Sequence, residues 1–240
     1  RMTSFPPGRG FVIASTRRHE AGARLAFMDD GYLDLDDFAE KLHENFTRDS
    51  IGKFAFVIRH GDTIRSGASG EKRSSRTPPA QAFTIYDRFN PASVSKWVTA
   101  VGLVHALQGM TGPGESVEDV LDRPILAYLP PSWSKGAFID SITFREVLSH
   151  RSGLRNPPSD RTYHDDVKTV IEAGINLGAK SRSYANINYG LARVLLASLA
   201  GYRGGDPEHP DASVRTASTF RDYLQDNLFD VCGIYNVQFE

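Results

Sequence analysis

The 240-residue sequence lacks several features that would place it in common protein classes. Cys232 is its only cysteine, so no disulfide can form within the chain. No run of about 18 apolar residues occurs, and no segment is therefore expected to span a bilayer. The formal net charge of −1 gives no reason to expect binding to nucleic acid or to an anionic membrane. What remains is a chain of ordinary composition, 40% hydrophobic and 24% charged, that can bury a sizeable core.

The N-terminal residues 1–7 lack the apolar core of a signal peptide. The compartment is therefore undecided: periplasmic or secreted if a signal peptide has been removed, and cytoplasmic otherwise. Several catalytic motifs are absent as well. The sequence has no G-x-S-x-G, no G-x-x-x-x-G-K-[ST], no H-E-x-x-H and no cysteine pair for zinc. We expect neither a cofactor nor a metal.

The clearest helix signal lies in residues 90–107. Asn90 is expected as its N-cap and Pro91 as its first helical residue, where the missing N–H of proline has no partner to lose. Mostly apolar side chains then recur at helical spacing and predict a broad buried face, formed by Val94, Trp97, Val98, Val101, Val104 and His105, with Leu103 and Leu107 beside them.

Ser93 and Lys96 lie on one face of this helix because they are three residues apart. A serine hydroxyl becomes a nucleophile only with a base within hydrogen-bond reach, and a lysine can serve if burial lowers its pKa. Free N–H groups in the first turn also favour negative charge beside the serine. By itself an S-x-x-K pair is common and indicates little.

Two further segments make the pattern specific. Residues 142–154 read ITFREVLSHRSGL, and Tyr184-Ala185-Asn186 stands before another helical pattern. Together with Ser93-x-x-Lys96, and in this order, they resemble the motifs of the penicillin-recognising serine hydrolases. The resemblance is to the branch of class C β-lactamases, D-alanyl-D-alanine carboxypeptidases and related esterases.

The resemblance implies a small-molecule acyl substrate: an ester, a β-lactam or a D-amino-acid amide. Ser93 would attack the carbonyl, and Lys96 and Tyr184 would act together as base and then acid. Asn186 would bind the acyl-side amide of the substrate or the Lys96 ammonium. For His150, within the second motif, we expect a structural role, because a histidine at a helix end usually satisfies local carbonyls.

The implied fold is mixed α/β, with an antiparallel sheet flanked by helices and a mainly helical region. We expect a helix over residues 34–46 and a hairpin of strands 54–58 and 63–67, turning at Gly61-Asp62. The expected division is an N-terminal arm in residues 1–33, a part with the first helix, hairpin and catalytic helix in 34–110, a mainly helical part in 111–229 and a return toward the sheet in 230–240.

The third motif of the family, K-T-G or H-x-G, does not occur in residues 187–240. We therefore expect an incomplete sheet, whose remaining strands come from a second polypeptide, a longer parent chain or residues outside this sequence. Residues 1–240 alone are then expected to be inactive and prone to aggregate, because two clear strands make a poor sheet.

Two other interpretations stay open. One is a catalytically incomplete or non-enzymatic binding member of the same family. The other is a histidine phosphatase, since Arg59-His60-Gly61 follows an apolar strand and resembles the signature in which a histidine is the nucleophile and an arginine holds the phosphoryl group. We find no convincing second catalytic histidine for that chemistry.

Overall fold

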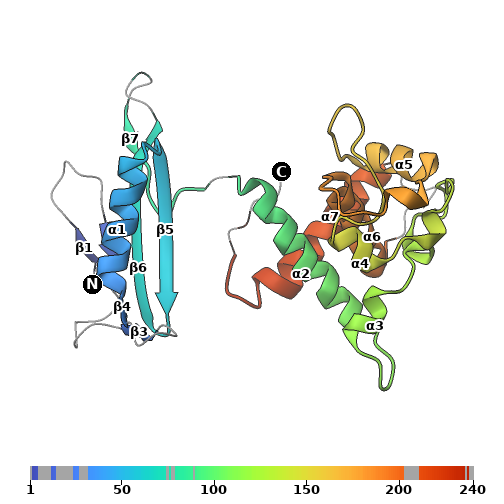
Figure 1. Ribbon diagram of the computed structural model, residues 1–240, viewed down its shortest axis with the longest axis horizontal. Helices are drawn as coiled ribbons and strands as arrows, with labels where there is room; N and C mark the ends of the chain where they lie inside the picture. Colours follow the sequence, from blue (N-terminus) through green and yellow to red (C-terminus); the bar gives the residue numbers. More distant parts are fainter. Residues whose placement is uncertain are drawn as a thin grey trace. The chain divides into compact units, whose positions relative to one another are not determined.

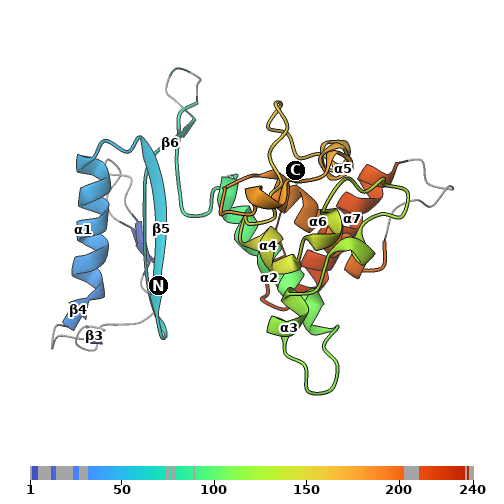
Figure 2. The same ribbon diagram turned by 45° about the vertical axis from the view of Figure 1, so that its right-hand side comes forward.

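The computed structural model divides the chain into two compact units, residues 1–90 and residues 91–240 (Figures 1 and 2). We call them unit 1 and unit 2 and describe each by itself. This division falls before the helix that carries Ser93, whereas the division expected from the sequence kept that helix within residues 34–110. The residues that the structure describes are 2–4, 12–14, 24–26, 32–73, 76, 79–88, 90–202, 211–235 and 237.

Unit 1 combines antiparallel strands with one helix. Its described strands form a three-stranded sheet of order β5-β6-β7 and two separate pairs, β1-β2 and β3-β4. The elements are β1 (Met2–Ser4), β2 (Val12–Ala14), β3 (Arg24–Ala26), β4 (Tyr32–Asp34), α1 (Leu35–Arg48), β5 (Lys53–His60), β6 (Thr63–Arg73) and β7 (Gln81–Ala82). Apart from these short strands, the expected N-terminal arm of residues 1–33 lies outside the described residues.

The expected hairpin is present in unit 1. β5 and β6 pair from Lys53 opposite Gly70 to His60 opposite Thr63, with the turn at residues 61–62. β6 continues to Arg73, well beyond the end expected near Gly67. Its polar second half lacks the alternating apolar pattern of a strand, but backbone pairing with β5 and then with β7 keeps it extended.

Helix α1 packs beside β6, and Figure 1 shows it running along the hairpin. Its N-cap is Asp34, whose carboxylate accepts a hydrogen bond from the backbone N–H of Asp36 at 2.8 Å. Leu35 and Ala39 are the buried residues of this helix. The side chain of Arg65 on β6 is also buried, and its guanidinium is paired with the carboxylate of Asp36 on α1. A polar pair therefore joins helix and sheet.

Unit 2 is helical in its described residues. It consists of short 3-10 turns and six α-helices, the last extended by a π-helical turn: η1 (Ala92–Val94), α2 (Ser95–Gln108), α3 (Val117–Leu121), η2 (Leu126–Tyr128), η3 (Ile139–Ser141), α4 (Phe144–Leu148), α5 (His164–Ala173), η4 (Leu177–Ala179), α6 (Ile187–Leu199), α7 (Ala212–Leu224) and η5 (Gln225–Phe229).

Helix α6 is the centre of unit 2. It is apolar on nearly all sides, and α2, α4, α5 and α7 pack around it. Close approach of α2 depends on Gly102, because a Cβ atom there would collide with Leu224 of α7 and crowd Leu196 of α6. Buried residues from all these helices form one continuous apolar core, within which Phe144 and Leu195 are fully buried.

The start of α2 differs from the expectation. Asn90 is not its N-cap: the chain first makes the 3-10 turn η1, and the α-helix begins at Ser95 after Val94, which makes no side-chain capping bond. Ala92 has a φ of +47°, outside the right-handed helical region, so the helix cannot run continuously from Pro91.

The buried face of α2 is also narrower than its apolar pattern suggests. Leu103 and Leu107 are buried as expected. Val94, Trp97 and Val101 instead expose 64%, 69% and 37% of their surface, so the prediction of one broad buried face is wrong for them. Helical spacing shows that side chains share a face, but which of them are covered depends on where the neighbouring helices lie.

The described elements confirm the expected mixed α/β class: helices together with an antiparallel sheet of three strands that does not close on itself. None of the helices in the described part of the chain combines the length and apolar character needed to cross a membrane.

Candidate active site

Ser93 lies in the middle of the 3-10 turn η1, is exposed, and stands directly before α2. Hydrogen bonds close this turn: the Val94 N–H donates to the Pro91 carbonyl at 3.0 Å, and both the N–H and the hydroxyl of Ser95 donate to the Ala92 carbonyl, the hydroxyl at 2.6 Å. Ala92, directly before Ser93, is held at positive φ, a conformation that costs an alanine free energy. Local strain of this kind is compatible with a serine presented in one fixed direction.

Three of the side chains expected in the site come together within unit 2. The Ser93 Oγ lies 2.8 Å from the Tyr184 Oη, although the two residues are far apart in the sequence. The Lys96 Nζ donates a hydrogen bond to the same Ser93 Oγ at 3.1 Å. Lys96 also lies over the Tyr184 ring, with its Nζ 5.2 Å from the ring centroid. Ser93 thus contacts both groups that could exchange protons with it.

The charge of Lys96 affects the phenol of Tyr184. The Lys96 ammonium, followed by the Ser93 hydroxyl, lowers the pKa of Tyr184 below its ordinary value near 10, because both interactions favour the phenolate. Partial removal from water acts in the opposite direction and is the weaker influence. A phenol with a lowered pKa is a better general base at moderate pH than a free tyrosine.

His150 supports the segment that carries Tyr184. Its Nδ1 accepts a hydrogen bond from the Ala185 N–H at 3.2 Å, and its carbonyl accepts one from the Ser183 N–H at 2.9 Å. The His150 ring lies against the ring of Tyr184, with centroids 4.6 Å apart. These contacts place a histidine of the second motif directly behind the candidate base.

His150 is arranged to be neutral. Burial is the main influence on its pKa and lowers it, since a charged imidazolium would lose hydration there. An Nδ1 that accepts a backbone N–H carries no proton of its own, which assigns the proton of the neutral ring to Nε2.

A second set of contacts, which sequence reasoning did not single out, joins the same two segments. The hydroxyl of Ser152 donates to the Asn188 Oδ1 at 2.5 Å, and both side chains are fully buried. The Asn156 Oδ1 accepts a hydrogen bond from the Ile187 N–H, the first residue of α6, at 2.9 Å. The available signal was weak: Asn188 is one polar residue in the helical pattern after Tyr184, and nothing in the sequence pairs Asn156 with the start of α6.

Asn186 stands apart from the other expected site residues. Its backbone carbonyl accepts hydrogen bonds from the N–H groups of Tyr189 and Gly190. Within the described part of the chain, its side chain makes no hydrogen bond to Lys96 or Ser93, and it does not cap α6. Among the described residues, the amide group of Asn186 has no hydrogen-bond partner.

The other candidate motif, Arg59-His60-Gly61, lies at the end of β5 in unit 1. The Arg59 Nε donates to the Gly61 carbonyl at 2.9 Å, a contact that stabilises the hairpin turn. Regarding metals, the described residues contain no group of three or more His, Cys, Asp or Glu side chains that could hold an ion.

Comparison with known proteins adds one finding to this geometry. The family model described as Beta-lactamase matches residues 35–240 of the chain, a range that includes Ser93, Lys96, Tyr184 and Asn186. No solved structure matches the chain.

Proposed function

This chain belongs to the beta-lactamase family, a family of hydrolases, and on that premise we propose that it is a serine hydrolase that forms an acyl-enzyme on Ser93. Its substrate would be an ester, a β-lactam or a D-amino-acid amide. The observation that supports this proposal most is the position of the Ser93 Oγ within hydrogen-bond reach of both the Tyr184 Oη and the Lys96 Nζ.

The direction of these two hydrogen bonds favours Tyr184 as the base. A lysine ammonium can only donate, so Ser93 accepts from Lys96. The proton of Ser93 is then free to point to the Tyr184 Oη, 2.8 Å away, where a phenolate accepts it. Lys96 favours that phenolate by its charge, and the two residues act as one coupled unit.

In the proposed reaction the Ser93 Oγ bonds to the acyl carbonyl carbon while its proton passes to Tyr184. The protonated Tyr184 returns this proton to the leaving group as the bond to that group breaks. Water then attacks the Ser93 ester, giving one proton to Tyr184, from which it returns to the Ser93 Oγ. The Ser93 N–H in the first turn would donate to the developing oxyanion, and the open amide of Asn186 would bind the acyl-side amide of the substrate.

Covalent labelling tests this proposal directly. The 240-residue protein is incubated with a fluorescent penicillin and, separately, with a p-nitrophenyl ester, and the adduct is mapped by peptide mass spectrometry. We expect the label on Ser93, its loss in Ser93→Ala, and unchanged labelling in Ser181→Ala, which removes an exposed serine elsewhere in unit 2. Label on Ser95 or His60 with Ser93 unmodified would contradict the proposal. Specific non-covalent binding of the penicillin without any adduct would instead favour a binding member of the family.

A further inference from the structure

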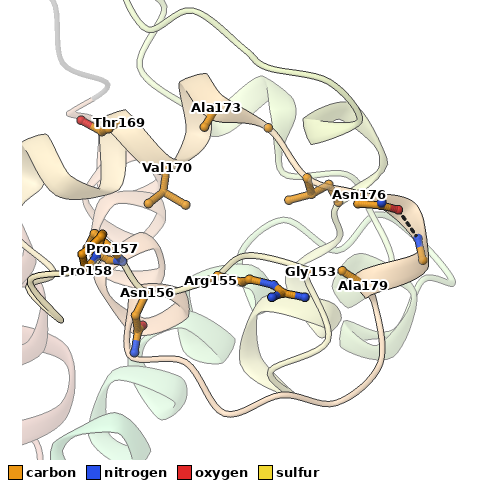
Figure 3. Close-up of a pocket in the computed structure, with 13 residues that line it drawn as sticks. Gly153, Arg155, Asn156, Pro157, Pro158, Thr169, Val170, Ala173, Asn176 and Ala179 are labelled. Atoms are coloured by element: carbon orange, nitrogen blue, oxygen red, sulfur yellow. Dashed lines mark hydrogen bonds between the residues drawn. The ribbon is translucent and has the colours of Figure 1, made fainter.

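Unit 2 contains a pocket of about 640 Å³ that is separate from the three catalytic groups. It lies between the loop 153–158, the C-terminal end of α5 and the segment 174–179, and Figure 3 shows these three walls. Neither Ser93, Lys96 nor Tyr184 lines it. Its volume is within the range of pockets that hold small organic ligands, about 300–1,000 Å³.

Most of the pocket wall is apolar. Pro157 and Pro158 form one side, and Val170 and Ala173 of α5 with Ile175 form another. In Figure 3 the side chain of Val170 points from the helix into the hollow. Proline also makes the first wall stiff, because its φ angle is restricted. An apolar group of a ligand would therefore meet a surface that is already formed.

Arg155 is the one charged residue among the described residues that line this pocket. Its side chain extends across the hollow in Figure 3. Within the described part of the chain, its guanidinium has neither a carboxylate partner nor a hydrogen bond, whereas Arg123, Arg145, Arg193 and Arg221 of unit 2 each have one. A guanidinium with five free donors beside an apolar wall is a ready partner for a carboxylate.

Asn176 supplies a further donor on the wall of the pocket. Its Oδ1 already accepts a hydrogen bond from the Gly178 N–H at 2.9 Å, the contact drawn dashed in Figure 3. Its Nδ2 has no acceptor among the described residues. Asn156 differs, because its Oδ1 accepts from Ile187 and its Nδ2 donates to Asp160 at 2.6 Å. Two side chains on the wall, Arg155 and Asn176, thus present open donors, which suits a ligand group that accepts.

We propose that this pocket binds a small amphipathic carboxylate, with the carboxylate on Arg155 and the apolar part against Val170, Ala173 and the two prolines. A phosphate dianion fits less well, since only one cation is present and most of the wall is apolar. The proposal does not depend on acylation of Ser93, because no catalytic side chain lines the pocket.

The test uses the full 240-residue chain carrying Ser93→Ala, which removes acylation, with sodium octanoate as the probe and isothermal titration calorimetry as the measurement. We expect octanoate to bind, and Arg155→Gln to weaken its binding about tenfold, the usual effect of losing one charge-assisted hydrogen bond. Octanamide, which has the same apolar chain without charge, should bind more weakly and should not respond to Arg155→Gln.

Two further variants make the result specific. Ala173→Trp fills the apolar side from an exposed position on α5 and should weaken octanoate binding, whereas Arg151→Gln removes an exposed arginine outside the pocket and should not. Hydrogen exchange should show protection by octanoate in residues 153–158 and 170–179. Absence of octanoate binding, or an equal effect of Arg151→Gln and Arg155→Gln, would overturn the proposal.

Discussion

Different interactions stabilise the interior of unit 2 and the interior of unit 1. In unit 2, apolar side chains surround α6 in one continuous core. In unit 1 the described residues bury fewer apolar side chains, and a polar pair, Arg65 with Asp36, joins the helix to the sheet. All three groups of the candidate site, and the histidine and asparagines that brace them, belong to unit 2.

The continuous core of unit 2 gives catalytic side chains a firmer support than the smaller core of unit 1. Catalytic geometry must be held within a fraction of an ångström, and side chains that rest on a packed core keep their rotamers. The Ser152–Asn188 bond that joins the second motif to α6 is fully buried. Asp36 in unit 1, by contrast, remains 39% exposed and its interaction with Arg65 is partly screened by water.

The largest expected effect is on the core of unit 2. Phe144→Ala leaves a cavity in a fully buried position and should lower the free energy of unfolding of unit 2 by about 3–5 kcal/mol. Hydrogen exchange with mass spectrometry should then show faster exchange in α2 and α6 and little change in the β5-β6 hairpin. Val214→Ala, at a 60% exposed position on α7, is the control and should have little effect. Equally faster hydrogen exchange in both units would show that they unfold together, and would contradict the proposed difference between their cores.

The next effect concerns the proton-transfer pair. In any form of the protein that hydrolyses a p-nitrophenyl ester, Lys96→Ala and Tyr184→Phe should each lower kcat/KM by about 10²-fold or more, and the double variant should lose far less than the product of the two effects, because the groups act as a unit. In the wild type kcat/KM should rise with pH as Tyr184 loses its proton, at a pH below its ordinary pKa near 10. Lys96→Ala should move this rise to higher pH. Additive losses with an unchanged pH profile would contradict the assignment.

A smaller effect is expected from the polar pair of unit 1. Asp36→Asn leaves the buried guanidinium of Arg65 without its carboxylate and should destabilise unit 1 by about 1–2 kcal/mol, a modest loss because Asp36 is partly exposed. The matched control is Asp37→Asn on the same helix turn; the Asp37 carboxylate pairs with exposed Lys41, so its loss should have little effect on stability. Thermal unfolding of both variants measures the difference. Equal losses would mean that burial of Arg65 does not matter.

The smallest effect is a pH dependence of stability from His150. Its pKa is lowered by folding, so the unfolded chain binds more protons and stability falls as pH decreases below the ordinary histidine pKa of about 6.5. Protonation would also place a proton on the Nδ1 that accepts from Ala185. His150→Asn keeps an acceptor and tolerates the positive φ of 58°, but it does not titrate in this range. The fall in the unfolding temperature of unit 2 between pH 7 and pH 5 should therefore be smaller in His150→Asn than in the wild type.

The control is His60→Asn, at an exposed position of unit 1, which should leave the unfolding of unit 2 unchanged. His43 in unit 1 also has a pKa lowered by burial and contributes in the same direction, so the measurement must follow unit 2 alone. An identical pH dependence in His150→Asn and the wild type would show that His150 is not the titrating group.

Much of this protein follows from its sequence alone. An apolar run followed by the Gly61-Asp62 turn located the β5-β6 hairpin, and helical spacing located α1, α2 and α6, because side-chain periodicity depends on local backbone geometry. Three motifs, which contain Ser93, Lys96 and Tyr184, indicated one family, and the match of residues 35–240 confirms that family. The proximity of Ser93 and Lys96 could be predicted, because residues three apart lie on one face of a helix.

Tertiary structure decided which side chains are buried and which distant residues are in contact, and neither can be read from the spacing of residues in the sequence. Val94, Trp97 and Val101 repeat with the same period as the buried Leu103 and Leu107, yet they are exposed, because coverage depends on neighbouring helices. The 3-10 turn before α2 follows from the positive φ of Ala92, which residue preference alone does not reveal. Contacts between residues distant in sequence, such as Ser93 with Tyr184 and Asn156 with Ile187, exist only because the helices of unit 2 pack around α6. Local preference determines elements, whereas the sites formed between them depend on the packing of the whole core.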